Sequence, residues 1–141
     1  MSKPRTILAF DFGLRRIGVA VGQDVTGSAS PLGVVANRST GVDSGRIAAL
    51  LAEWHPTQLV VGMPAHADGT PSDIQEHVER FIETLREYGL PVETVDERYT
   101  SVEAERALKT ARQSGTRGRI SKEEIDSAAA VFIAERYLAS A

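Results

Sequence analysis

The chain has 141 residues, apolar and charged fractions of 42% and 25%, and a formal net charge of −3. This length is typical of one domain with its own core, here residues 1–141. The absence of cysteine excludes disulfides and thiolate metal sites. No apolar run approaches the ~18 residues of a membrane span, and the apolar N-terminal run stops at Asp11, so we expect a cytoplasmic protein without a signal peptide.

The N-terminal part of the chain predicts three antiparallel strands. Residues 5–12 are mostly apolar, a tight connection follows at 13–16, and residues 17–22 read as the second strand of a hairpin. A third strand is expected around 31–36. The polar, glycine-containing segment 37–45 is expected to be a loop. The chain is therefore predicted to begin β-β-β.

Helices and strands alternate after residue 44. We expect a helix from about 44 to His55, a strand at 59–64, a helix that Ser72 and Gln75 open and Gly89 stops, a strand at 92–96, a helix from Thr100 to about 111, and a final helix from Ser121 to about 138. The order β-β-β-α-β-α-β-α-α predicts an α/β fold, with a mixed five-stranded sheet and helices on both faces.

Three acidic residues stand where the local pattern favours apolar side chains. Asp11 interrupts the first strand, Glu97 follows the strand at 92–96, and Asp126 lies on the apolar face of the last helix. A buried carboxylate is costly unless a cation or hydrogen bonds compensate it. Active sites of open α/β sheets gather at the carboxyl ends of parallel strands, so we predict one shared metal site.

Each of these carboxylates also has a purely structural interpretation. Asp11 could shape the turn at Gly13 through hydrogen bonds, and Asp126 could interact with the dipole of its helix. An acid at the end of a strand is common. Strand alternation lets only one of Asp96 and Glu97 face the site, and we favour Glu97.

Three carboxylates gathered in one place need a compensating cation. Two unit charges ~4 Å apart repel by about 4 kcal/mol at an effective dielectric of ~20. Without cysteine or a histidine motif, the ion would be a hard cation such as Mg²⁺ or Mn²⁺. A pair of such ions activates water and stabilises an in-line phosphoryl displacement.

The basic residues are concentrated away from the acids. Residues 68–97 hold nine acids and two arginines, whereas residues 106–122 hold six bases and no acid. A solvated helix face beside a charged loop is the simpler interpretation. Alternatively, the bases contact the phosphates of a nucleic acid, and we predict this role for Arg15, Arg16, Arg98, Lys109, Arg112, Arg117, Arg119 and Lys122. The loop 112–120 would then order on the phosphate backbone.

Short motifs run in order along nearly the whole chain. They are A-F-D-F-G-x-x-R-I-G-V-A-V-G at 9–22, V-V-G-M-P at 60–64 with D-G-T at 68–70, D-E-R-Y-T-S at 96–101 and K-E-E-I-D-S-A-A-A at 122–130. With these motifs the chain resembles the YqgF-type family of Holliday-junction-resolvase-like proteins, also called pre-16S rRNA nucleases. The resemblance implies a ribonuclease-H-like fold and hydrolysis of phosphodiester bonds, with Mg²⁺ or Mn²⁺ held by Asp11, Glu97 and Asp126.

The resemblance implies a structured nucleic acid as substrate. Processing of pre-16S rRNA ends is the expected role, and cleavage of four-way DNA junctions by a homodimer is the alternative to a monomeric RNA nuclease. Related resolvases carry a fourth carboxylate where this chain has Ala129, which weakens the expectation of a second metal ion.

Two functions of other classes are kept open. One is an actin-like or sugar-kinase-like nucleotide binder, because Asp11–Gly22 also resembles the first phosphate loop of that superfamily. The length argues against it, since those proteins bind nucleotide between two such domains. The other is a non-catalytic RNA-binding module, against which the intact set of three carboxylates argues.

Overall fold

The computed structural model describes residues 5–38, 41–63, 75–96 and 122–140, with the backbone alone at 96, 122–126 and 140. The elements are β1 (Thr6–Asp11), β2 (Arg16–Gln23), β3 (Ser28–Arg38), β4 (Gly41–Val42), α1 (Ser44–Trp54), β5 (Gln58–Met63), α2 (Gln75–Arg86), β6 (Val92–Asp96) and α4 (Lys122–Ser140). The helix expected from residue 100 to about 111 lies outside the described residues.

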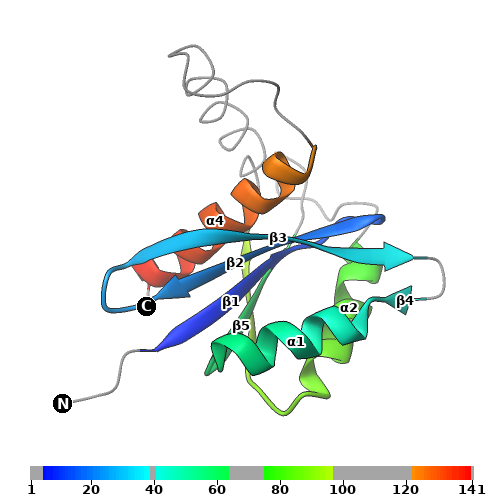
Figure 1. The fold of residues 1–141 in the computed structure, drawn as a ribbon, viewed down its shortest axis with the longest axis horizontal. Helices are drawn as coiled ribbons and strands as arrows, with labels where there is room; N and C mark the ends of the chain where they lie inside the picture. The colour runs from blue at the N-terminus through cyan, green and yellow to red at the C-terminus, as the bar shows by residue number, and fades with distance from the viewer. Residues whose placement is uncertain (1–4, 39–40, 64–74, 97–121, 141) are drawn as a thin grey trace.

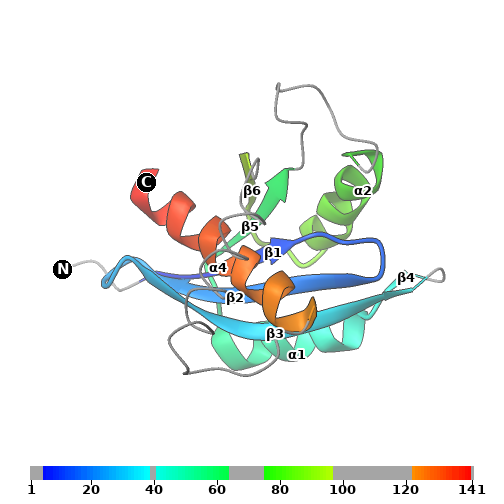
Figure 2. The same cartoon turned by 90° about the horizontal axis from the view of Figure 1, so that it is seen from above.

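The strands form one mixed sheet in the order β4-β3-β2-β1-β5-β6 (Figures 1 and 2). The β1–β2, β2–β3 and β3–β4 pairs are antiparallel, whereas β5 is parallel to both β1 and β6. The carboxyl ends of β1, β5 and β6 consequently lie at the same edge of the sheet, which we call the carboxyl edge. The predicted α/β architecture and hairpin are confirmed.

The strand count and the loop at 37–45 are corrected by the structure. Over the described residues the sheet has six strands rather than five, because the segment expected to be a loop continues β3 to Arg38 and contains β4. Asn37 pairs with Val42 and Arg38 with Gly41. Gly41 has φ 129°, a backbone conformation that favours glycine. A two-residue strand is too short to show alternation in the sequence, which is why it was missed.

Helices cover both faces of the sheet, as predicted (Figures 1 and 2). One face carries Leu8 and Phe10 and packs on α1 and α2, with Phe10 edge-on to Phe81 at a centroid distance of 5.6 Å. We call this the α1–α2 face. The other, the α4 face, carries Ile7, Ala9 and Val60 and packs on Ile133 and Ala134. Two apolar layers on opposite sides explain why β1 and β5 are apolar along most of their length.

The boundaries of α1 follow from local chemistry. The Asp43 side chain accepts a hydrogen bond from the Arg46 backbone N–H at 3.1 Å, as an N-cap residue does. His55 ends the helix in the left-handed conformation, and Pro56 follows. The predicted end at His55 is therefore confirmed.

The buried side of α2 follows the 3.6-residue period of a helix. Val78, Phe81, Ile82 and Leu85 are all buried, whereas the proposed capping residue Ser72 lies outside the described residues.

The last helix lies close against the sheet because small residues separate them. A Cβ atom added to Gly22 would lie 3.1 Å from Leu138 Cδ1 and 3.2 Å from Ile7 Cγ1. Ala129, Ala130 and Ala134 are fully buried in α4. Among the described helices, none has the length and apolar character of a membrane span.

Candidate metal centre

Asp11 is the last residue of β1 and lies at the carboxyl edge. Successive side chains of a strand point to opposite faces. Since Ile7 and Ala9 belong to the α4 face, alternation along β1 places Asp11 on that face too. Its side chain is half-buried. The predicted position of Asp11 near the end of a strand that is parallel to two others is therefore confirmed.

Glycines occupy the positions beside Asp11 on both neighbouring strands. Gly18 of β2 is directly opposite Asp11 in the antiparallel register. On the other side Phe10 is paired with Val61, and one further step along the register places Gly62 beside Asp11. Neither glycine contributes a side chain next to the carboxylate, although both glycines are buried. The backbones of the neighbouring strands therefore approach Asp11 closely on both sides.

The strand β6 ends at the same edge. Met63 pairs with Asp96 in the parallel β5–β6 register. Val92 packs on the α1–α2 side and Val95 on the α4 side. Glu97 lies outside the described residues, and only the backbone of Asp96 is described. The choice between these two acids therefore stays a prediction.

A β-bulge anchors the beginning of α4 to the sheet. Val19 pairs with Gly33 but Ala20 pairs with Pro31, so Leu32 is the extra residue on β3. The Ser127 hydroxyl accepts a hydrogen bond from the Gly33 N–H at 3.2 Å and donates one to the Val19 carbonyl at 3.3 Å. At the bulge, the Ser127 hydroxyl thus bridges a backbone N–H of β3 and a backbone carbonyl of β2.

This anchor immediately follows Asp126 in the chain. The helical face predicted to contain Asp126 also contains Ala129, Ala130 and Ile133, all of which are fully buried. The prediction that this face packs on the sheet is confirmed. The Asp126 side chain lies outside the description, so its approach to Asp11 stays a prediction. Among the described side chains, no three His, Asp or Glu residues are grouped as a metal site would require.

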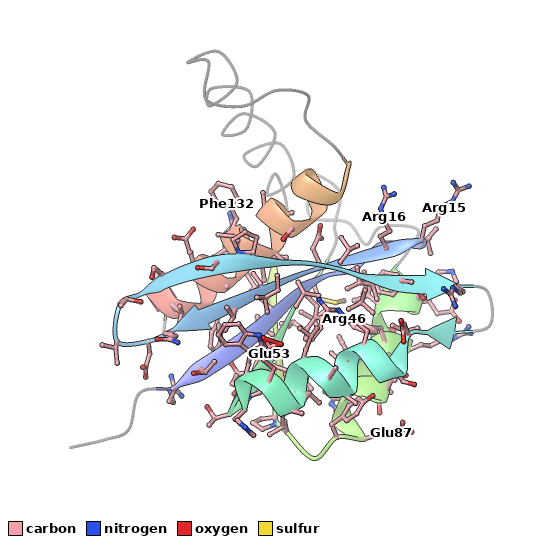
Figure 3. The ribbon with its side chains drawn as sticks, viewed as in Figure 1. Arg15, Arg16, Arg46, Glu53, Glu87 and Phe132 are labelled. Carbon is pink, nitrogen blue, oxygen red and sulfur yellow. The ribbon has the colours of Figure 1, made fainter. Side chains whose placement is uncertain are left out.

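The turn after β1 presents two of the predicted basic residues. Arg15 is exposed and Arg16 half-buried, and both project to the α4 side of the sheet, away from α1 (Figure 3). Ile17, Val19 and Val21 belong to the α1–α2 face, so Arg16 has the parity of Asp11. The side chains of the other predicted phosphate contacts, Arg98, Lys109, Arg112, Arg117, Arg119 and Lys122, lie outside the description.

Asn37 holds this turn in place and was missed in the sequence. Its Nδ2 donates to the Gly13 carbonyl at 2.8 Å, and its backbone N–H donates to the Arg15 carbonyl at 2.9 Å. A Cβ on Gly13 would lie 2.3 Å from the Arg16 carbonyl oxygen, so the turn closes tightly on itself. In the sequence, Asn37 is a polar residue at the start of a segment expected to be a loop, and nothing in the local pattern indicates that it fixes a turn 24 residues earlier.

The pKa of Tyr137, further along α4, is raised above its ordinary value. Partial burial raises the pKa of the Tyr137 hydroxyl, a hydrogen bond to Glu93 and the charge of that carboxylate raise it further, and Arg5 opposes them. Tyr137 lies about three turns beyond Asp126 on the helix. We therefore assign it to the packing of α4 rather than to the site at the carboxyl edge.

Comparisons with known proteins agree with this arrangement. The model of the RuvX family, described as Holliday junction resolvase, matches residues 5–140. Relatives from Burkholderia lata and Burkholderia cenocepacia, each named "Putative pre-16S rRNA nuclease", are 47% and 46% identical over 138 residues, which is 97% of this chain and 91% of theirs.

Two solved structures share the fold. Thermus thermophilus RuvC in complex with a Holliday junction substrate has a TM-score of 0.57 at 17% identity, over 96% of this chain and 94% of that one. The yeast mitochondrial Holliday junction resolvase Ydc2 has a TM-score of 0.51 at 9% identity, over 94% and 77%. Their fold is the ribonuclease-H-like fold that the sequence implied. From its sequence and its fold together, the chain belongs to the RuvX family.

Proposed function

We propose that this protein is a divalent-metal-dependent endonuclease that hydrolyses phosphodiester bonds at the ends of pre-16S rRNA in the cytoplasm. The observation that carries the proposal is the position of Asp11, a half-buried carboxylate at the carboxyl edge with Gly18 opposite. The names of its relatives support the reaction and the substrate class.

The ligands that we propose for Mg²⁺ or Mn²⁺ are Asp11, Glu97 and Asp126. We favour Glu97 over Asp96 because Val95 packs on the α4 side, and a position two residues later has the same parity in an extended chain. The anchoring of Ser127 to the sheet supports Asp126, the preceding residue, as the ligand from α4. Ala129, at the position of the fourth carboxylate of related resolvases, is fully buried and has no oxygen in its side chain, so it is not among the proposed ligands.

Each group has a defined task in this proposal. When bound, the metal would activate water and stabilise the charge that develops on the phosphate. The Asp11 carboxylate would hold the ion at the carboxyl edge, beside Gly18, which contributes no side chain there. Arg15 and Arg16 contact phosphates beside the scissile bond, because both lie on the α4 side of the adjacent turn.

A cleavage assay on pre-16S rRNA tests the proposal. Wild-type protein is expected to cleave the precursor with Mg²⁺ or Mn²⁺ and not with EDTA, and Asp11→Asn is expected to be inactive. The matched control is Asp24→Asn, which changes an acid in the β2–β3 turn that pairs with Arg5 and should retain activity. Metal-independent cleavage, or full activity of Asp11→Asn, would refute the proposed chemistry.

A second candidate function is cleavage of four-way DNA junctions. It is favoured by the structural likeness to a RuvC that was solved with such a substrate. Two cuts per junction need two active sites, so this function requires a homodimer. The same assay with a synthetic junction, run beside a measurement of molecular mass in solution, separates the two substrates.

The two functions of other classes have their own tests. Saturable, tight ATP binding would favour the nucleotide binder. RNA binding that survives in the Asp11→Asn/Asp126→Asn variant, with no activity in the wild type to lose, would favour the non-catalytic RNA-binding module.

A further inference from the structure

A groove of about 490 Å³ lies beside the turn that follows β1. Its walls come from three parts of the chain, namely this turn, the β3–β4 hairpin and α2, which lie together at one end of the molecule (Figure 1). We call it the hairpin groove. Its volume is within the range of sites that bind small ligands. It takes no part in the metal site proposed above.

The described rim of the hairpin groove is basic. Arg38 from β3 and Arg80 and His77 from α2 line it, and no acidic residue is among the described residues of its lining. Glu76 pairs with Arg80 at 2.9 Å, one turn along α2, with both side chains largely exposed. Exposed pairs of this kind contribute little stability, so a phosphate can replace the carboxylate at low cost. The charge of the rim suits an anion.

The base of the hairpin groove is apolar. Phe12 and Phe81 meet there with ring centroids 5.5 Å apart. Leu14 adds a side chain that is 55% exposed, although it is a large hydrophobic residue. Apolar and aromatic surface of this kind packs against the faces of nucleobases. A ligand with one anionic group and one flat apolar group therefore matches the groove.

The hairpin groove and the Asp11 site lie on opposite sides of one short turn. Phe12 directly follows Asp11 and has the opposite parity, so it packs on the α1–α2 face. Asn37 connects the two regions, because it lines the groove and donates to the Gly13 carbonyl in the turn. An RNA strand that crosses this turn would meet Arg15 on the α4 side and the hairpin groove on the other.

From these contacts we propose that the hairpin groove binds one nucleotide of the substrate strand, next to the phosphodiester bond held at Asp11. The base packs against the exposed side chain of Leu14, while Arg38 and Arg80 contact the phosphate. The inference rests on the proposed nuclease function and extends it to a subsite on the other face of the sheet. The groove would thereby fix the path of the strand over the turn.

Binding measurements in an inactive background test the inference. The Asp11→Asn protein is titrated with fluorescent single-stranded RNA at several salt concentrations, with and without the added pair Arg38→Ala/Arg80→Ala. We expect about tenfold weaker binding from the pair, since each lost contact is charge-assisted. The slope of log K against log salt should also fall by about 0.7 for each lost phosphate contact. Thermal unfolding verifies that the variants are folded.

The control is Arg86→Ala in the same background. Arg86 is an exposed arginine of α2 that pairs with Glu83 and is absent from the lining of the groove, and its loss should leave affinity and slope unchanged. Leu14→Ser tests the contact with the base, and should weaken binding of RNA more than binding of an abasic strand of the same length.

The outcomes separate this inference from the function on which it rests. If the Arg38→Ala/Arg80→Ala pair behaves like Arg86→Ala while the wild type cleaves RNA, the subsite is wrong and the nuclease stands. Another outcome is that the arginine pair is needed for binding of uridine or adenosine monophosphate but not for binding of single-stranded RNA. In that outcome the groove is a free-nucleotide site and the inference is again overturned. If the wild type neither binds nor cleaves any RNA, the proposed function fails as well.

Discussion

Asp11 faces Gly18 across the β1–β2 ladder, so the half-buried carboxylate has no side chain opposite it on that strand. The relationship gives a steric reason for a glycine inside a strand that is otherwise apolar and buried. It also provides the most direct mutational test of the site.

Substitution of Gly18 should impair activity in proportion to the size of the new side chain. Gly18→Ala is expected to reduce kcat/KM for RNA cleavage roughly tenfold and Gly18→Val roughly 100-fold, since a displacement of about 1 Å at a reacting group can cost that much. Binding of Mn²⁺, measured by calorimetry, should weaken in parallel. A folded Gly18→Val protein with wild-type kcat/KM would show that the space beside Asp11 is not used.

Divalent metal should stabilise the fold through Asp11. A ligand that binds only the native state stabilises it by about 2.7 kcal/mol at 100 times its Kd. Saturating Mn²⁺ is therefore expected to raise the Tm of the wild type, and EDTA to reverse the rise. The Asp11→Asn variant should lose the shift and the Asp24→Asn variant should keep it. An equal shift in all three proteins would place the metal elsewhere.

Removal of the Ser127 hydroxyl should destabilise the protein. Ser127→Ala leaves the Gly33 N–H and the Val19 carbonyl without the partner that joins them, and buried groups left unsatisfied cost about 1–3 kcal/mol each. We expect the free energy of unfolding in urea to fall by about 2 kcal/mol. Ser30→Ala, at an exposed position of β3, should change it by less than about 0.5 kcal/mol. Equal values for the two variants would mean that the bulge does not depend on Ser127.

The turn after β1 should not tolerate a side chain at Gly13. A Cβ there would lie 2.3 Å from a backbone oxygen, so Gly13→Ala must displace the turn. We expect a loss of roughly 3 kcal/mol in the free energy of unfolding and a large loss of cleavage. Gly27→Ala is the comparison, because Gly27 has φ 65° but open space around it. It should cost about 1 kcal/mol and leave cleavage intact.

The sequence predicted those parts of the fold that depend on local pattern. The apolar run around Phe10, the helix before Gly89 and the stop at His55 all correspond to observed elements. The length of β3 was underestimated, because the predicted strand 31–36 is flanked by the polar residues Ser28 and Ser30 before it and Asn37 and Arg38 after it. The bulge at Leu32 accommodates Pro31 and Gly33 within one strand.

The parts that were missed depend on contacts between distant segments. Ser127 finds its partners 94 and 108 residues earlier, at a bulge that leaves no periodic signal. Asn37 acts on a turn 24 residues away. The basic rim of the hairpin groove joins Arg38 to Arg80 only after α2 has packed beside the hairpin. For Asp11 the sequence was sufficient, because a carboxylate in an apolar strand is conspicuous by itself.

The hydrogen bond between Ser127 and Gly33 allows the docking of α4 on the sheet to be followed by hydrogen exchange. Because the Gly33 amide hydrogen is bonded to a helix rather than to a strand, its rate of exchange with deuterated solvent measures how often the C-terminal helix lifts from the sheet. Slower exchange at that one position on addition of metal or RNA would reveal, without any mutation, that ligand binding and helix docking are energetically coupled.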